Sequence, residues 1–284
     1  MVEGRWDLTV HDIDGDFPSW VELSAQGGWF VGKWGSARPV KEISLTPTTA
    51  EWSLPKQYEG RETDLVFKGE LVDGQLVGTT LSDRGEEIRW TGVKAPALDV
   101  PAGEPQFGEA VELVGTDLNG WHVRWPSMDS NWAITEDGLE NRATGTDLIS
   151  DAKFTDFQLI AVYRYPKGSN SGIYLRGRYE YQVLDDHGNE PSVGSSAAIY
   201  GYLTPTSLPI HPANEWNTAE ITLIGRTVTV RLNGTLVHDA QEIPGITGGA
   251  LDAAEGEPGP ILVQGDHGPV SYRRLTVRPI IGFA

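Results

Sequence analysis

Apolar and polar residues alternate along much of the second half of the chain. In AEITLIGRTVTVRLNGTLV, residues 219–237, apolar residues are separated by Thr, Glu and Arg, as expected for an antiparallel sheet with one face in water. Asn233-Gly234 predicts a tight turn there. Further strand-like segments are FTDFQLIAVYRYP, SGIYLRGRYEYQVLD, AAIYGYL and PILVQGDHGPVSYRRLTVRPI. They predict a two-sheet jelly roll or sandwich, with no helix longer than a turn or two.

The first hundred residues predict a smaller β-domain. FKGELVDGQLVGTTL places Asp73-Gly74 between alternating apolar residues, a strong hairpin signal, and neighbouring segments repeat the pattern as a meander would. APALDVPAGEPQF then brings three prolines without periodicity, which indicates a linker. We therefore expect a small β-domain at 1–97, a linker at 98–107 and a larger β-domain at 108–284.

Composition excludes several functions. Among 284 residues there is no cysteine, so disulfides, thiolate metal sites and a cysteine nucleophile are excluded. The net charge of -18 disfavours nucleic acid and anionic membranes, and favours a neutral or cationic ligand such as a carbohydrate. No apolar run is long enough for a membrane span, and MVEGRWDLTV lacks the features of a signal peptide. We expect a periplasmic or secreted location if a signal peptide preceded this sequence, and a cytoplasmic one otherwise.

The densest group of polar side chains lies in YRYPKGSNSGIYLRGRYEYQVLDD, residues 163–186. Because alternate residues of a strand share a face, Glu180 and Gln182 should point one way and their tyrosine neighbours the other. A turn at Gly177 would bring Arg176 near Glu180, and Asp185 would join them only through a β-bulge. The simpler interpretation is a solvated sheet face with surface ion pairs. No P-loop, dinucleotide fingerprint, GxSxG or HExxH motif occurs.

The order of these segments, together with VELVGTDLNGWHV before them, resembles the 3-keto-disaccharide hydrolase domain family. The resemblance runs from about Val111 to Pro279. It implies an all-β, concanavalin A-like jelly-roll sandwich, here preceded by a small antiparallel domain that is a calycin-like barrel or a meander. Two segments depart from the family. Its Leu-Gln-x-His-Gly is Val263-Gln264-Gly265-Asp266-His267-Gly268 here, and its Phe-Arg-Asn is Tyr272-Arg273-Arg274.

The resemblance implies cleavage of glycosides oxidised at C3 of the sugar. The ketone acidifies the C2 hydrogen, so that a base can remove it before the glycosidic oxygen leaves C1 and water adds. We expect Glu180 as the acid/base carboxylate, Asp185 as a second carboxylate or orienting partner, Arg176 as electrostatic stabiliser and His267 as proton carrier. A bound divalent cation is an alternative stabiliser. The substrate-binding residues we expect are Arg164, Asn170, Tyr174, Gln182, His211, Trp216 and Gln264.

Two other functions remain open at this point. ExQxxD at Glu180, Gln182 and Asp185 has the spacing of the ExDxxE signature of retaining jelly-roll glucanases, but Gln182 replaces the middle Asp. That chemistry needs two carboxyl groups about 5 to 5.5 Å apart. The alternative from a different class is a non-catalytic carbohydrate-binding module with an aromatic-lined groove.

Overall fold

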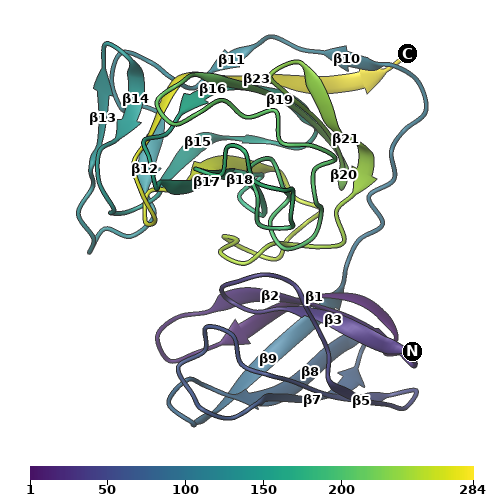
Figure 1. Ribbon diagram of the computed structural model, residues 1–284. Helices are drawn as coiled ribbons and strands as arrows, with labels where there is room; N and C mark the ends of the chain where they lie inside the picture. The colour runs from purple at the N-terminus through teal and green to yellow at the C-terminus, as the bar shows by residue number, and fades with distance from the viewer. The chain divides into compact units, whose positions relative to one another are not determined.

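The computed structural model describes residues 1–284, which form strands and loops but no α-helix. The chain divides into two compact units, one containing residues 1–97 and 245–255 and the other residues 98–244 and 256–284 (Figure 1). The all-β class expected from the sequence is therefore confirmed. The structure contains no helix of the length and apolarity needed to cross a membrane.

The first unit contains one nine-stranded antiparallel sheet in the order β4-β3-β2-β1-β9-β8-β7-β6-β5. Consecutive strands pair except β4 and β5, which are the two edges of the sheet, and β1 also pairs with β9, so that the first and last strands of the meander are neighbours. Its strands are β1 Gly4–His11, β2 Phe17–Ser24, β3 Gly27–Val31, β4 Arg38–Pro39, β5 Glu42–Leu45, β6 Thr49–Leu54, β7 Leu65–Val72, β8 Gln75–Leu81 and β9 Glu87–Lys94.

Large aromatic side chains fill the core of this unit. The Trp52 ring stacks on the Phe67 ring, with centroids 5.0 Å apart and planes 2° apart, and meets Trp90 edge-on. Between β7 and β8, Asp73 and Gly74 have φ of 50° and 86°, as a two-residue hairpin turn of type I′ requires. The hairpin predicted at this position is confirmed.

The second unit is a jelly-roll sandwich of two antiparallel sheets, visible as stacked layers in Figure 1. The outer sheet has the order β13-β14-β23-β16-β19-β20-β21, with β10 and β11 also paired to β23. The inner sheet has five strands in the order β12-β15-β22-β17-β18. The bounds are β10 Pro105–Phe107, β11 Val111–Glu112, β12 Trp121–Val123, β13 Trp132–Thr135, β14 Gly138–Asn141, β15 Leu148–Phe154, β16 Phe157–Arg164, β17 Asn170–Leu175, β18 Tyr179–Leu184, β19 Asn217–Ile224, β20 Thr227–Leu232, β21 Thr235–Glu242, β22 Gly259–Val263 and β23 Val270–Phe283.

Side chains at alternate positions of both sheets meet between the layers. Tyr163 of β16 and Tyr181 of β18 are both fully buried, and their hydroxyls lie 3.2 Å apart. The tyrosines on either side of Glu180 therefore face the core, as strand alternation predicted. Asn233 and Gly234 form the turn between β20 and β21 with φ of 48° and 81°. One expectation needs correction: the last residues of the predicted linker, Pro105–Phe107, form β10 because they pair with the end of β23.

Candidate active site

The face of the inner sheet that points away from the core carries polar side chains from neighbouring strands. Cross-strand pairing places side chains of paired residues on the same face. Glu180 pairs with Tyr174, and Tyr174 pairs with Leu262. Gln182, on the same face of β18 as Glu180, pairs with Gly172. The Gly172 carbonyl accepts a hydrogen bond of 2.9 Å from the backbone N–H of Gln264. The sheet therefore holds Glu180, Tyr174, Gln182 and Gln264 on one surface, which we call the polar face.

Glu180 is the central group of the polar face. Its side chain is 5% exposed, and its Oε2 accepts a hydrogen bond of 3.0 Å from the Tyr174 hydroxyl. The neighbouring position is Gly172, where an added Cβ would lie 2.4 Å from Glu180 Oε1. The missing side chain at Gly172 therefore provides the space in which the carboxyl group lies.

Burial raises the pKa of Glu180 to about 8, although the Tyr174 hydrogen bond and the charge of His267 both lower it. The charges of Asp266 and Asp147 raise this pKa further. A carboxyl group with a pKa near neutrality can both give and take a proton at physiological pH. The surroundings of Glu180 therefore give its carboxyl group a pKa that suits acid/base chemistry.

His267 lies in the loop after β22, where its charge acts on Glu180. Its Nδ1 is paired with Asp266 Oδ1. The hydrogen bond to Asp266 raises the pKa of His267, burial lowers it, and the charges of Asp266, Glu180 and Asp147 raise it again. His267 and Asp266 form a couple in which the carboxylate orients the imidazole and favours its protonated form.

Asp147 fixes the backbone of the loop that carries this couple. It is 1% exposed, and its Oδ1 accepts the Gly265 amide at 2.8 Å and the Asp266 amide at 3.3 Å. Arg124 donates to its other oxygen at 3.3 Å. Burial and the charge of Asp266 raise the pKa of Asp147 to about 6, against the opposing effect of its hydrogen bonds to Gly265 and Arg124.

Three amide side chains offer hydrogen-bonding groups along the strands that carry the polar face. Gln182 and Gln264 are 4% and 7% exposed, and the Oε1 atom of each has no protein partner. Asn170, at the start of β17, also has an unpartnered buried Oδ1. Unpaired buried acceptors cost free energy unless a ligand satisfies them. These groups can therefore bind the hydroxyl groups of a substrate.

The structure does not bring Arg176 to Glu180. Arg176 lies in the turn between β17 and β18 with φ of 54° and is 1% exposed. Its guanidinium donates to the Gly225 carbonyl, and its centre lies 5.3 Å from the ring centroid of Tyr179, a core residue. The expectation of a polar floor formed by Arg176 and Glu180 is corrected, because the turn directs Arg176 toward the core side.

Asp185 also lies apart from Glu180. The pairing of β17 with β18 is regular from Tyr179 to Leu184, so there is no bulge to shift Asp185 onto the polar face. Its carboxylate instead accepts the Gly168 amide at 2.7 Å. Asp185 stabilises the turn before β17.

The remaining residues expected at the site lie together elsewhere. Arg164 pairs with Asp137 at 2.6 Å, and its guanidinium lies 4.6 Å from the Trp216 ring centroid. Arg273 lies over the same ring at 4.0 Å. His211 Nδ1 contacts the Trp216 carbonyl at 2.9 Å. Because arginines lie over Trp216, its stacking surface is already used within the chain.

Sequence reasoning missed Asp147, Asp266 and Arg124 as members of this cluster. Asp266 was visible as the neighbour of His267, and Asp147 directly precedes the apolar start of β15. An acidic residue directly before a buried strand could have indicated Asp147, but no sequence pattern indicates Arg124. Nowhere in the chain do three or more His, Asp or Glu side chains converge in an arrangement able to hold a metal ion.

The comparison with protein families decides the assignment of this domain. Residues 109–278 match the model of the 3-keto-alpha-glucoside-1,2-lyase-like domain. The chain belongs to this family. The match covers the inner sheet from β12 to β22 and the loop with Asp266 and His267. The family resemblance inferred from the sequence is confirmed.

Individual relatives of this lyase-like domain are more distant. A 3-keto-disaccharide hydrolase of Bacteroides thetaiotaomicron is 28% identical over 161 residues, covering 44% of this chain and 52% of the relative. The chain thus spans about half the length of that curated relative. A solved structure of a candidate glycosyl hydrolase from Parabacteroides distasonis is 27% identical, with a TM-score of 0.48, covering 60% of this chain and 84% of that one. A carbohydrate-binding module of Bacillus subtilis is 17% identical with a TM-score of 0.35, covering 57% and 92%.

Proposed function

We propose that the lyase-like domain cleaves 3-keto-glycosides by removing the C2 proton, expelling the aglycone from C1 and hydrating the product. The observation that carries the proposal is the buried carboxyl of Glu180, held by Tyr174 and acted on by the charge of His267. Membership of the lyase-like family supports the choice of an oxidised sugar as substrate.

The chemistry assigns a role to each group. Glu180 takes the proton from C2, whose acidity the C3 ketone raises, and an enolate forms. The C1–O bond then breaks as the C1=C2 double bond forms, and protonated His267 gives its proton to the departing oxygen. Water adds across the double bond and yields the free 3-keto sugar. Asp266 orients His267 through the hydrogen bond to Nδ1.

Amide side chains complete the site by binding the sugar. Gln182, Gln264 and Asn170 each have a buried oxygen without a protein partner, which can accept a hydrogen bond from a hydroxyl group. Their amide nitrogens can donate to the enolate oxygen or to other ring oxygens. Held on rigid strands, these groups would orient the C2–H bond toward Glu180.

The pH dependence follows from the two titrating groups. The base must be ionised, so activity should rise with pH through the pKa of Glu180, which burial raises to about 8. The acid must be protonated, so activity should fall again as His267 loses its proton, at a pKa that Asp266 raises above 6.5. Because the two groups interact, the limbs of the bell-shaped profile belong to the pair.

The retaining glucanase alternative has weaker support. It requires a second carboxylate about 5 to 5.5 Å from Glu180, and the ExQxxD motif nominates Asp185 for this role. Asp185 lies beyond the end of β18 and accepts the Gly168 amide. The middle position of the motif is Gln182, which cannot ionise.

A substrate comparison tests the proposal. The full chain is incubated with a 3-keto-disaccharide and with the parent disaccharide, each with and without EDTA, and the products are separated by chromatography. We expect cleavage of the keto compound alone. In deuterated water the released keto sugar should carry deuterium at C2, because hydration returns a solvent proton there. Cleavage of the parent compound would support the glucanase alternative, and cleavage of neither would leave a binding module.

A further inference from the structure

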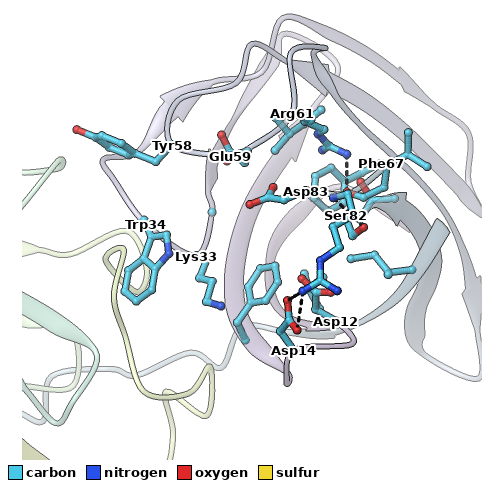
Figure 2. Close-up of a pocket in the computed structure, with 18 of the residues that line it drawn as sticks. Asp12, Asp14, Lys33, Trp34, Tyr58, Glu59, Arg61, Phe67, Ser82 and Asp83 are labelled. Carbon is cyan, nitrogen blue, oxygen red and sulfur yellow. Dashed lines mark hydrogen bonds and ion pairs between the residues drawn. The ribbon is translucent and has the colours of Figure 1, made fainter. Parts of the chain in front are cut away.

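The first unit contains a pocket of its own at one end of its sheet. The pocket has a volume of about 150 Å³, roughly the volume of cavities that hold a six-membered ring. Its lining residues all lie between Val10 and Ile88, on the ends of strands and on the loops that join them. Figure 2 shows Trp34 and Tyr58 on one side of the pocket, with Arg61, Ser82 and Asp83 across from them.

Arg61 is a buried cation in the wall of this pocket. It is 9% exposed, and its only hydrogen bond goes from Nη1 to the Leu81 carbonyl, while its Nε has no partner. A guanidinium has five N–H donors, so most of its donor capacity is unused within the chain. The charges of Asp83 and Glu59 act on Arg61, but its unused N–H donors are costly when buried unless something else accepts from them. The unused donors of Arg61 therefore indicate a ligand that carries hydrogen-bond acceptors.

Asp83 supplies the complementary acceptor. Its carboxylate is exposed at the pocket and makes no hydrogen bond or close ion pair within the chain. Of the other acidic groups in the lining, Asp14 pairs with Arg84 at 2.7 Å, Glu59 pairs with Arg38, and Asp12 Oδ1 accepts the Ile13 backbone amide at 2.7 Å. Arg61 therefore offers unused donors to an occupant, and Asp83 offers an unused acceptor.

Aromatic rings form the remaining surface. Phe30 and Phe67 are buried at the base, with ring centroids 4.9 Å apart. Trp34 and Tyr58 are 39% and 62% exposed at the rim. Lys33 lies over the Phe17 ring at 5.2 Å and over the Trp34 ring at 5.6 Å. Aromatic faces beside a few polar groups are typical of ligand pockets and suit the C–H faces of a sugar ring.

The charges decide between ligand classes. An anion would meet the carboxylates of Asp12, Asp83 and Glu59, and a cation would meet Arg61 and Lys33, which lies over the Phe17 and Trp34 rings. A neutral ring with several hydroxyl groups can accept from Arg61, donate to Asp83 and cover the exposed Tyr58 ring. We propose that the first unit is a carbohydrate-binding module whose pocket takes one neutral pyranose ring.

This site is separate from the polar face, because its lining contains no residue of the inner sheet. A bound glycan would keep the lyase-like domain at a raised local concentration of sugar ends, as linked binding modules do. The proposal does not depend on the reaction assigned above. Weak affinity, with a Kd on the order of millimolar, is expected for a single ring with so few polar contacts.

Nuclear magnetic resonance of the intact protein provides a local test. The indole N–H signal of Trp34 is assigned from its loss in Trp34→Phe, and is followed while methyl α-D-glucopyranoside is added to about 50 mM, well above the expected Kd. We expect a saturable shift. D-Glucuronate and D-glucosamine, which carry the same ring with a negative or positive charge, should shift the signal at higher concentration or not at all.

Matched variants connect the shift to the pocket. Tyr58→Ala and Asp83→Asn alter exposed residues and should weaken binding roughly 5- to 10-fold. Trp29→Ala removes another exposed aromatic, 48% exposed on β3 and outside the lining, and should leave the affinity unchanged. Glu180→Gln should also leave it unchanged. No shift of the Trp34 signal, equal affinity in Asp83→Asn, or stronger binding of either charged ring would overturn the proposal.

Discussion

The two sheets of the sandwich differ in how many of their residues are buried. Strands β16 and β19 of the outer sheet alternate strictly between buried and half-exposed positions. In the inner sheet every residue of β22 is buried, as is nearly every residue of β17 and β18. Strands β16 and β19 keep one face partly in water, whereas strands β17, β18 and β22 of the inner sheet bury both of their faces.

The consequence for polar residues is opposite in the two sheets. Glu220 on the half-exposed face of β19 lies opposite Arg231 of β20, an arrangement that costs little in contact with water. Glu180 on β18 is 5% exposed and needs partners such as the Tyr174 hydroxyl. Buried carboxyl groups are expensive, and this cost is one reason why we propose the polar face of the inner sheet as the functional surface of the sandwich.

Replacing the two glutamates gives the largest contrast. Glu180→Gln should reduce kcat/KM on a 3-keto-disaccharide by roughly 10²- to 10⁴-fold, because the amide cannot accept the C2 proton. Glu220→Gln is the matched control and should retain nearly full activity. Steady-state kinetics with circular dichroism spectra of both variants measure the effect. Full activity of Glu180→Gln would remove Glu180 from the mechanism.

The space beside Glu180 gives the second contrast. Gly172→Ala places a methyl group against the carboxyl oxygen, with a distance of 2.4 Å before relaxation, so the side chain must move. We expect kcat to fall about 10- to 100-fold, because a displacement of an ångström is enough to misalign a base. Gly115→Ala, whose added methyl would meet its nearest atom only at 3.7 Å, is the control. Unchanged kcat in Gly172→Ala would show that the position of the carboxyl is not critical.

The dependence of stability on pH gives the smallest contrast. Burial raises the pKa of Glu180 from 4.5 to about 8, so the folded state binds one more proton than the unfolded state between these values. The free energy of unfolding should therefore fall as pH rises through this window, by up to a few kcal/mol at about 1.4 kcal/mol per pKa unit. Glu180→Gln should remove this part of the decline, and Glu220→Gln should not.

Thermal unfolding at about pH 5, 6, 7 and 8 measures this effect for the wild type, Glu180→Gln and Glu220→Gln. Asp147, whose pKa burial raises to about 6, adds a decline in the same direction that all three share. Parallel curves for the wild type and Glu180→Gln would mean that Glu180 is ionised in the folded protein well below pH 8.

The strand pattern and the hairpin turns were determined by the sequence alone. Alternation separated Glu180 and Gln182 from the core tyrosines, because the two-residue period of a strand is a local property. Asp73-Gly74 and Asn233-Gly234 marked their turns, since few residues adopt a positive φ without strain. The order of the segments was also enough to indicate the lyase-like family.

The membership of the site was decided by the tertiary structure. Asp147, Arg124 and His267 come from different parts of the chain and meet only because β12, β15 and β22 pair side by side. Arg176, four residues from Glu180, turns away because its backbone adopts φ of 54° and its guanidinium reaches the carbonyl of Gly225, in the turn between β19 and β20. Local periodicity fixes which face a side chain takes within a strand. The neighbours on that face depend on long-range pairing, which no short stretch of sequence specifies.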